Sequence, residues 1–103
     1  MAKQTAKVRR RREIWKKTNG ICAHCGRATS SVNQTIDHFI PKLYGGGLDR
    51  RNLMPLCRKC NENRKAKIID ARTYYKYASV EVIEECNLYK LFWNSGRGIY
   101  KVG

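Results

Sequence analysis

The spacing of hydrophobic and polar positions predicts a helix and then a strand in the first half of the chain. Residues 8–18 (VRRRREIWKKT) are mostly strong helix formers with three apolar side chains, and Asn19-Gly20 follows as a stop signal. They predict a helix with a narrow apolar face. Residues 32–40 (VNQTIDHFI) alternate loosely between apolar and polar and are rich in β-branched and aromatic residues, which favours a strand. Pro41 ends that strand.

Shorter segments surround the predicted strand. Residues 21–26 (ICAHCG) predict a tight knuckle, and residues 44–47 (YGGG) predict a flexible loop. We interpret residues 51–56 (RNLMPL) as a short connection to the segment that follows. From Cys60 to about Ile68, the composition is compatible with a helix of about two turns.

The last third of the chain predicts two further helices. Asp70 can cap one over residues 71–77, and Ser79 can cap another over residues 80–93. One apolar face of the second helix repeats at spacings of four, three and four, through Val82, Cys86, Tyr89 and Trp93. Cys86 is therefore interpreted as a small core residue rather than a ligand or nucleophile.

These elements and the length of 103 residues predict a single α+β domain. We expect a basic N-terminal helix in residues 1–19, a core in residues 20–68 and a C-terminal helical extension in residues 69–103. A domain of this size buries a modest core, so its folding gains much from a covalent or metal staple.

The net charge of +14 predicts a polyanionic partner, and nucleic acid is the simplest one. The charge is concentrated toward the start: residues 1–17 carry +7, residues 18–69 carry +6 and residues 70–103 carry +1. The first run is either a solvated helix face or a contact to the DNA backbone, and its charge density favours DNA. The residues expected at DNA are Arg9, Arg10, Arg11, Arg12, Lys16, Lys17, Arg64 and Lys65.

The basic start leads into no apolar segment of the kind found in signal peptides, and no uncharged run approaches the roughly 18 residues of a membrane span. We therefore expect a soluble protein of the reducing cytoplasm, with no membrane partner.

Four of the five cysteines form two Cys-x-x-Cys pairs, Cys22/Cys25 and Cys57/Cys60. In a reducing compartment this spacing indicates a metal site rather than disulfides. Two such turns supply the four thiolates of a structural Zn²⁺ site. The 31 residues between the pairs exceed the spacer of a simple zinc ribbon, so a sizeable segment is displayed there. His24 is interpreted as an exposed loop residue, because four thiolates already suffice.

That segment carries the residues suited to hydrolysis of a phosphodiester. Asp37 and His38 are adjacent, and Asn52 and Asn61 follow. The reaction needs a base, a cation and groups that orient both. The intrinsic pKa of His38 suits a base near neutral pH, while Asp37 and Asn61 offer oxygen ligands for Mg²⁺ or Mn²⁺. Taken singly, Asp37 can also be a turn residue, and Asn52 or Asn61 a helix cap.

Two geometric expectations accompany this assignment. Asn61 shares one face of the predicted helix with Arg64 and Lys65, at spacings of three and four. On an ideal strand, Asp37 and His38 point to opposite faces. Both can therefore serve one site only if the strand ends or bends there.

The motifs DH (Asp37-His38), NL (Asn52-Leu53) and CRKCN (residues 57–61), followed by basic residues, resemble the HNH endonuclease family, also called ββα-metal or His-Me finger nucleases. The resemblance covers about residues 20–68. It implies two antiparallel strands and a helix gripping one metal ion, stapled by a zinc site of four cysteines. It also implies His38 as the general base, Asp37 and Asn61 as metal ligands, and Asn52 as the residue that fixes the loop and orients His38.

The family resemblance further implies cleavage that leaves a 5′-phosphate and a 3′-hydroxyl. Many members carry His at the position of Asn61, so this chain is an H-N-N variant, and the asparagine argues against a preference for soft metals. The small size is typical of a phage or mobile-element enzyme in a bacterial host.

Three functions fit the sequence. The first is a metal-dependent DNA endonuclease that nicks DNA or cuts both strands. The second is a non-catalytic zinc-stapled module that binds DNA or RNA, which accounts for the cysteines and charge but not for Asp37, His38, Asn52 and Asn61 at family spacing. The third is an adaptor for a phage machine such as a packaging motor, whose proteins are then the partners.

Overall fold

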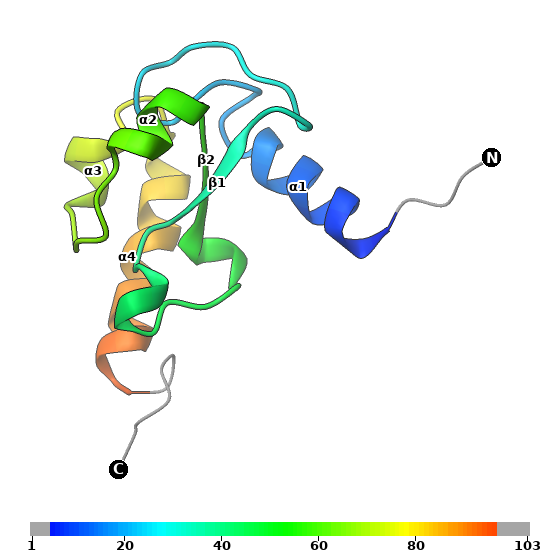
Figure 1. Ribbon diagram of the computed structural model, residues 1–103. Coiled ribbons are helices and arrows are strands. Elements are labelled where there is room, and N and C mark those ends of the chain that lie inside the picture. The colour runs from blue at the N-terminus through cyan, green and yellow to red at the C-terminus, as the bar shows by residue number, and fades with distance from the viewer. Residues whose placement is uncertain (1–4, 97–103) are drawn as a thin grey trace.

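The computed structural model describes residues 5–96. Its sheet has two antiparallel strands, β1 and β2, with α2 following β2 directly (Figure 1). The elements in chain order are α1 (Ala6–Lys16), β1 (Thr35–His38), η1 (Lys42–Tyr44), η2 (Arg50–Asn52), β2 (Leu53–Leu56), α2 (Arg58–Asn63), α3 (Ala71–Tyr74) and α4 (Val80–Asn94). The predicted α+β class, with a ββα core and flanking helices, is confirmed. The predicted three-part division stays a prediction, and its residues 1–4 and 97–103 lie outside the described part.

The strand β1 is shorter than the predicted residues 32–40, because residues 31–33 form a turn before it and residues 39–40 form a bend after it. Its partner β2 corrects the interpretation of residues 51–56 as a mere connection. Asp37 pairs with Met54, and His38 pairs with Leu53. The sequence showed no alternation here because all four residues of β2 are buried. Pro55 is tolerated because no third strand among residues 5–96 pairs with β2, so its missing N–H interrupts no further pairing.

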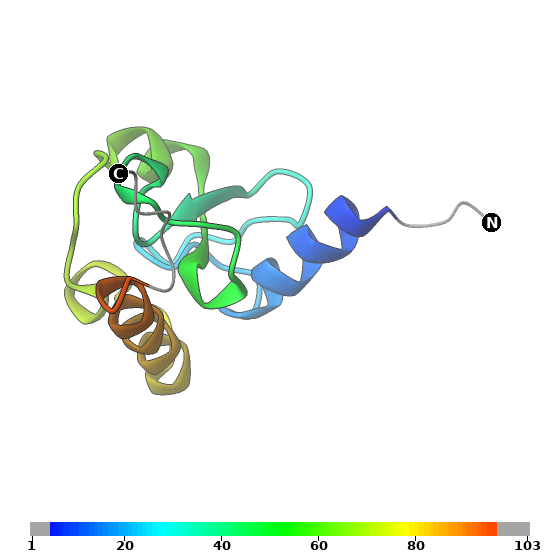
Figure 2. The same ribbon diagram turned by 90° about the horizontal axis from the view of Figure 1, so that it is seen from below.

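Helix α1 projects from one side of the molecule in both views (Figures 1 and 2). The side chain of Thr5 caps its first turn, accepting from Val8 N. The helix begins two residues before the predicted span of residues 8–18 and ends two residues before its predicted end, and Asn19 and Gly20 after it adopt the positive φ of a stop signal. Ile14 is buried, whereas residues 5–10 are exposed. The helix therefore joins the core by its C-terminal half and presents its N-terminal half to solvent.

Helix α2 starts and ends earlier than the predicted helix from Cys60 to about Ile68. Cys57 caps it, with Cys60 N donating to its Sγ at 3.5 Å. Arg64 directly follows the last helical residue, and its ψ of 99° is extended rather than helical. The prediction that Arg64 and Lys65 share a helix face with Asn61 is therefore wrong. The reason is that Arg64 turns inward, where its Nη1 donates to the carbonyls of Lys65 and Lys67.

The C-terminal helices are capped where predicted, by Asp70 at α3 and Ser79 at α4. Helix α3 has only four residues rather than the predicted seven, while α4 closely matches its predicted span. The apolar face of α4 is confirmed, and Ile83 joins it in the core. Cys86 is fully buried there, as expected for a packing residue. Within residues 5–96, no helix has the length and apolar character to cross a membrane.

Candidate metal and catalytic site

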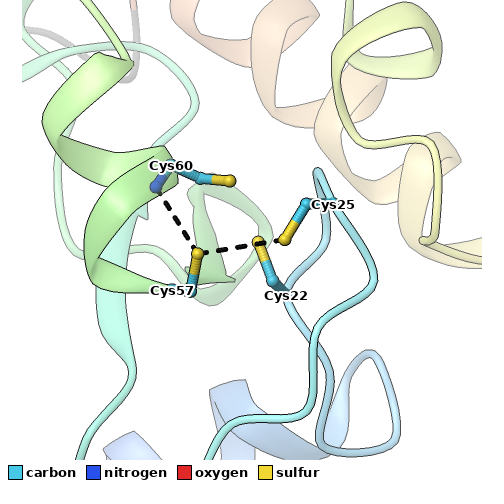
Figure 3. Close-up of side chains that lie close together, drawn as sticks. All are labelled: Cys22, Cys25, Cys57 and Cys60. Carbon is cyan, nitrogen blue, oxygen red and sulfur yellow. Dashed lines mark hydrogen bonds between the residues drawn. The ribbon is translucent and has the colours of Figure 1, made fainter.

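The four paired cysteines meet in one cluster (Figure 3). Their Sγ atoms all lie within 4.8 Å of one another, and Cys25 Sγ is 3.9 Å from Cys57 Sγ. Zinc–sulfur bonds of about 2.3 Å in a tetrahedron place sulfurs about 3.8 Å apart. All four cysteines are free thiols rather than disulfides. The cluster can therefore hold a metal ion with little movement.

Backbone hydrogen bonds bring the two cysteine pairs together. In the first knuckle, Gly26 N donates to Cys22 O at 2.9 Å, and Ala23 N donates to the carbonyl of Pro55 in β2 at 2.9 Å. The second pair spans the start of α2. Burial raises the pKa of both Cys57 and Cys60, and hydrogen bonds among the four cysteines lower the pKa of Cys57 to about 7 while they raise that of Cys60 further. The cluster thus fixes the origin of the helix that carries Asn61.

His24 is outside the sulfur cluster, as expected, but it is not an exposed loop residue. Its ring stacks on Tyr74 at a centroid distance of 4.0 Å, and its Nδ1 lies 2.7 Å from Tyr74 O. The sequence placed this histidine in a loop correctly but gave no sign that α3 would fold over it.

One pocket of about 290 Å³ brings Asp37, His38 and Asn61 together. We call it the site pocket. It is lined by Ile36, Asp37, His38, Pro41, Lys42, Leu43, Asn61, Arg64, Lys65 and Ala66. β1 ends at His38, which is the condition under which adjacent strand residues can reach one site.

Asp37 is buried and accepts two hydrogen bonds on the same oxygen. Arg64 Nε donates to its Oδ2 at 3.1 Å, and the hydroxyl of Tyr75 donates to Oδ2 at 2.6 Å. Burial raises the pKa of Asp37, and the bonds from Tyr75 and Arg64 oppose that rise. Sequence analysis identified neither partner as a site residue, because it assigned Arg64 to DNA binding and because Tyr75 belongs to no recognised motif.

His38 is half-buried at the end of β1. Burial lowers its pKa below the ordinary 6.5, and the positive charge of Lys42 lowers it further. Its Nε2 is buried and has no hydrogen-bond partner among the described residues. The imidazole is consequently neutral at neutral pH and has the form that can accept a proton.

Asn52 pins the loop after His38 from a fully buried position. Its Oδ1 accepts from Ile40 N at 2.7 Å, and its Nδ2 donates to Ile40 O at 3.2 Å and Gly47 O at 3.0 Å. A Cβ at Gly46 would approach Ile40 O to 1.6 Å, so glycine is required at this close crossing. Asn52 therefore fixes the loop, while its orienting effect on His38 stays a prediction.

Comparison with known proteins gives a family for the segment around this pocket. Residues 22–67 match the family model described as HNH endonuclease. We call these matched residues, 22–67, the HNH segment. Over 60 residues the chain is 30% identical to a CRISPR-associated endonuclease Cas9 of Corynebacterium diphtheriae, and the match covers 52% of this chain and 6% of that protein.

The fold has a solved counterpart in the Type II-C Cas9 enzyme from Actinomyces naeslundii. The match has a TM-score of 0.58 and 17% identity, and it covers 80% of this chain and 10% of that one. The likeness therefore extends beyond the HNH segment, but the chain spans only a small part of either Cas9 protein.

The basic residues predicted at DNA divide into two groups around the HNH segment. Three serve the fold. Arg11 donates to carbonyls of residues 31–34, Lys17 Nζ donates to Arg50 O and Leu53 O at 2.7 Å each, and Arg64 binds Asp37. The others are exposed: Arg9, Arg10, Arg12, Lys16 and Lys65. The sequence could not distinguish the basic residues that bond within the fold from the exposed ones, because the difference depends on which acceptor groups lie nearby in the folded chain.

Proposed function

We propose that the protein is a metal-dependent DNA endonuclease that hydrolyses phosphodiester bonds at the site pocket. The observation that carries the proposal is the meeting of Asp37, His38 and Asn61 in one pocket within the HNH segment. A base and two oxygen ligands placed together match the needs of phosphodiester hydrolysis.

His38 acts as the general base. It takes a proton from the attacking water as the new oxygen–phosphorus bond forms, and the bond from phosphorus to the 3′ oxygen breaks. The 3′ oxygen then takes up a proton from solvent, giving a 3′-hydroxyl and a 5′-phosphate. The lowered pKa of His38 supports this role, because the neutral imidazole is present at neutral pH.

Asp37 and Asn61 hold the catalytic cation, Mg²⁺ or Mn²⁺. Both offer oxygen, and the side chain of Asn61 makes no hydrogen bond within residues 5–96. Neither the Arg64 nor the Tyr75 bond uses Oδ1 of Asp37. When bound, the cation supplies positive charge to the phosphate oxygens as negative charge develops there. The sulfur cluster holds a separate structural Zn²⁺.

DNA is held by exposed basic side chains on two sides of the molecule. Arg9, Arg10 and Lys16 lie along α1, and Lys65 lies at the site pocket. Their contacts are to phosphate, so they contribute affinity that depends on salt and not on base sequence.

The decisive experiment incubates supercoiled plasmid with wild-type protein in Mg²⁺, Mn²⁺, Ni²⁺, Zn²⁺ or EDTA, beside His38→Ala. We expect nicked or linear product with Mg²⁺ or Mn²⁺, little with Ni²⁺ or Zn²⁺, and none in EDTA. His38→Ala should lose cleavage and retain DNA affinity. Asn61→His should shift activity toward the softer ions, since it replaces an amide oxygen by imidazole.

A second candidate is a non-catalytic, zinc-stapled nucleic-acid-binding module. It is favoured by one observation, the ion pair that already neutralises Asp37 through Arg64. In that case the plasmid stays intact in every metal, while gel shifts still detect salt-dependent binding. Full cleavage by a purified His38→Ala protein would contradict the assignment of the base.

A further inference from the structure

Tyr75 contacts Asp37, a residue of the site pocket, from outside the HNH segment. The family match ends at residue 67, and Tyr75 directly follows α3. Its side chain is 1% exposed and its ring packs edge-on against Phe39 at a centroid distance of 6.1 Å. From this position its hydroxyl makes a 2.6 Å hydrogen bond to Asp37 Oδ2. A residue that the family motif does not include therefore contacts the carboxylate on which the proposed metal site depends.

The hydrogen bonds at Asp37 are asymmetric. Tyr75 and Arg64 both donate to Oδ2, so the carboxylate cannot rotate about its Cβ–Cγ bond without breaking both. Oδ1 takes part in neither bond, and Asp37 lines the site pocket. The oxygen that remains for a cation is thus held in one direction.

We propose, on the basis of the proposed function, that Tyr75 is a positioning residue that holds Oδ2 of Asp37 so that Oδ1 is presented to the divalent cation. Groups that hydrogen-bond to a metal-binding carboxylate fix its orientation, and their loss typically weakens metal binding by about 10- to 100-fold. The Tyr75 hydroxyl is buried beside the Asp37 carboxylate and donates to it, so it acts as the donor in the pair.

Tyr75 is a cleaner probe of this arrangement than Arg64. The guanidinium of Arg64 also donates to the carbonyls of Phe39 and Lys67, at 3.1 and 3.0 Å, so its removal releases several segments together. Tyr75→Phe removes a single hydroxyl and keeps the ring that packs on Phe39. Arg64 remains in place and still neutralises Asp37.

The test measures Mn²⁺ binding by electron paramagnetic resonance in zinc-loaded protein that carries His38→Ala, so that no cleavage occurs. Tyr75→Phe in this background should weaken Mn²⁺ binding by about 10-fold or more. In protein with His38 intact, the Mg²⁺ concentration for half-maximal cleavage should rise by a similar factor, with most of the maximal rate recovered at saturating Mg²⁺. A partly unfolded variant would lose rate equally at all Mg²⁺ concentrations, so this measurement separates positioning from stability.

Tyr89→Phe is the matched control. Tyr89 is equally buried, and its hydroxyl accepts from Gly47 N at 3.0 Å rather than touching Asp37. It should lower the melting temperature without changing Mn²⁺ affinity. Unchanged Mn²⁺ affinity and Mg²⁺ dependence in Tyr75→Phe, with active wild type, would overturn this inference alone. Wild type that neither binds Mn²⁺ nor cuts DNA would overturn the proposed function with it.

Discussion

His38 shows how two neighbouring features set the state of a single side chain. Burial by itself disfavours the imidazolium, and Lys42 adds repulsion from across the site pocket. A free imidazole would be largely protonated below pH 6.5, whereas the folded protein keeps the base neutral to lower pH. Because the unfolded chain takes up that proton first, this residue also makes the folded state lose stability as the pH falls below 6.5.

The residue-scale prediction concerns Lys42. Lys42→Gln removes the repulsion and should raise the pKa of His38, moving the acid limb of the cleavage rate to higher pH. The rate should therefore fall most near about pH 6 and little at about pH 8. The measurement is kcat at saturating DNA against pH.

Lys42→Arg keeps the charge and is the matched control, so its profile should overlay that of wild type. Added salt should reproduce part of the Lys42→Gln shift in wild type, because it screens the interaction. If Lys42→Gln and Lys42→Arg have the same acid limb, Lys42 does not act on His38 through its charge.

At the scale of elements, α1 packs against the fold on one side, and its exposed cations are the proposed contact to DNA. Its inner side docks through Ile14 and through Trp15, whose Nε1 donates to Thr29 O at 3.1 Å. Arg11 adds hydrogen bonds to three carbonyls within residues 31–34. The outer side carries the exposed cations. The helix is therefore both a structural support for the turn before β1 and the proposed holder of DNA.

The element-scale prediction separates these functions with two adjacent arginines. Arg11→Ala should lower the free energy of unfolding by about 1–2 kcal/mol, because three carbonyls lose a charged donor. Arg10→Ala should change it by less than about 0.5 kcal/mol, since Arg10 is exposed. Urea unfolding measures both.

DNA binding should show the opposite order. Arg10→Ala should reduce the slope of log K against log salt by about 0.9 if it contacts one phosphate. Arg11→Ala, measured where it is folded, should leave the slope close to that of wild type. An Arg10→Ala slope equal to that of wild type would mean that Arg10 is solvated and makes no contact with DNA.

At the scale of the whole molecule, the sulfur cluster joins parts of the chain that are far apart in sequence. It links the knuckle that holds Cys22 and Cys25 to the start of α2, across the segment that supplies Asp37, His38 and Asn52. A small core benefits strongly from such a link, and metal binding then contributes directly to the free energy of folding.

The molecule-scale prediction is that the purified protein contains about one zinc ion per chain and unfolds when the zinc is removed. Elemental analysis and thermal melting with and without a strong chelator test this. Cys57→Ser should lose zinc and melt at a much lower temperature. Cys86→Ala should keep its zinc, because Cys86 packs in the core outside the cluster. A zinc-free protein with an unchanged melting curve would contradict the prediction.

The sequence by itself determined the features that depend on near neighbours. Helix caps such as Asp70 and Ser79 act within one turn, and each Cys-x-x-Cys turn closes on itself, so their spacing is enough to recognise them. The motif around Asp37 and His38 was recognisable for the same reason, although the strand ends at His38 rather than directly before Pro41 as predicted. The prediction that Asp37, His38 and Asn61 form one site rested on these local signals and the family resemblance, and one pocket brings the three residues together.

Only the tertiary structure decided the features that depend on distant partners. β2 is buried on both sides and so lacks the alternation that marks a half-buried strand. Arg64 and Arg11 look like solvated cations until the fold places carbonyls and a carboxylate beside them. Tyr75 lies 38 residues from Asp37, and no local pattern records that pair. Charge and composition give the number of polar groups in a chain, but the packing of distant segments decides which of them are buried together.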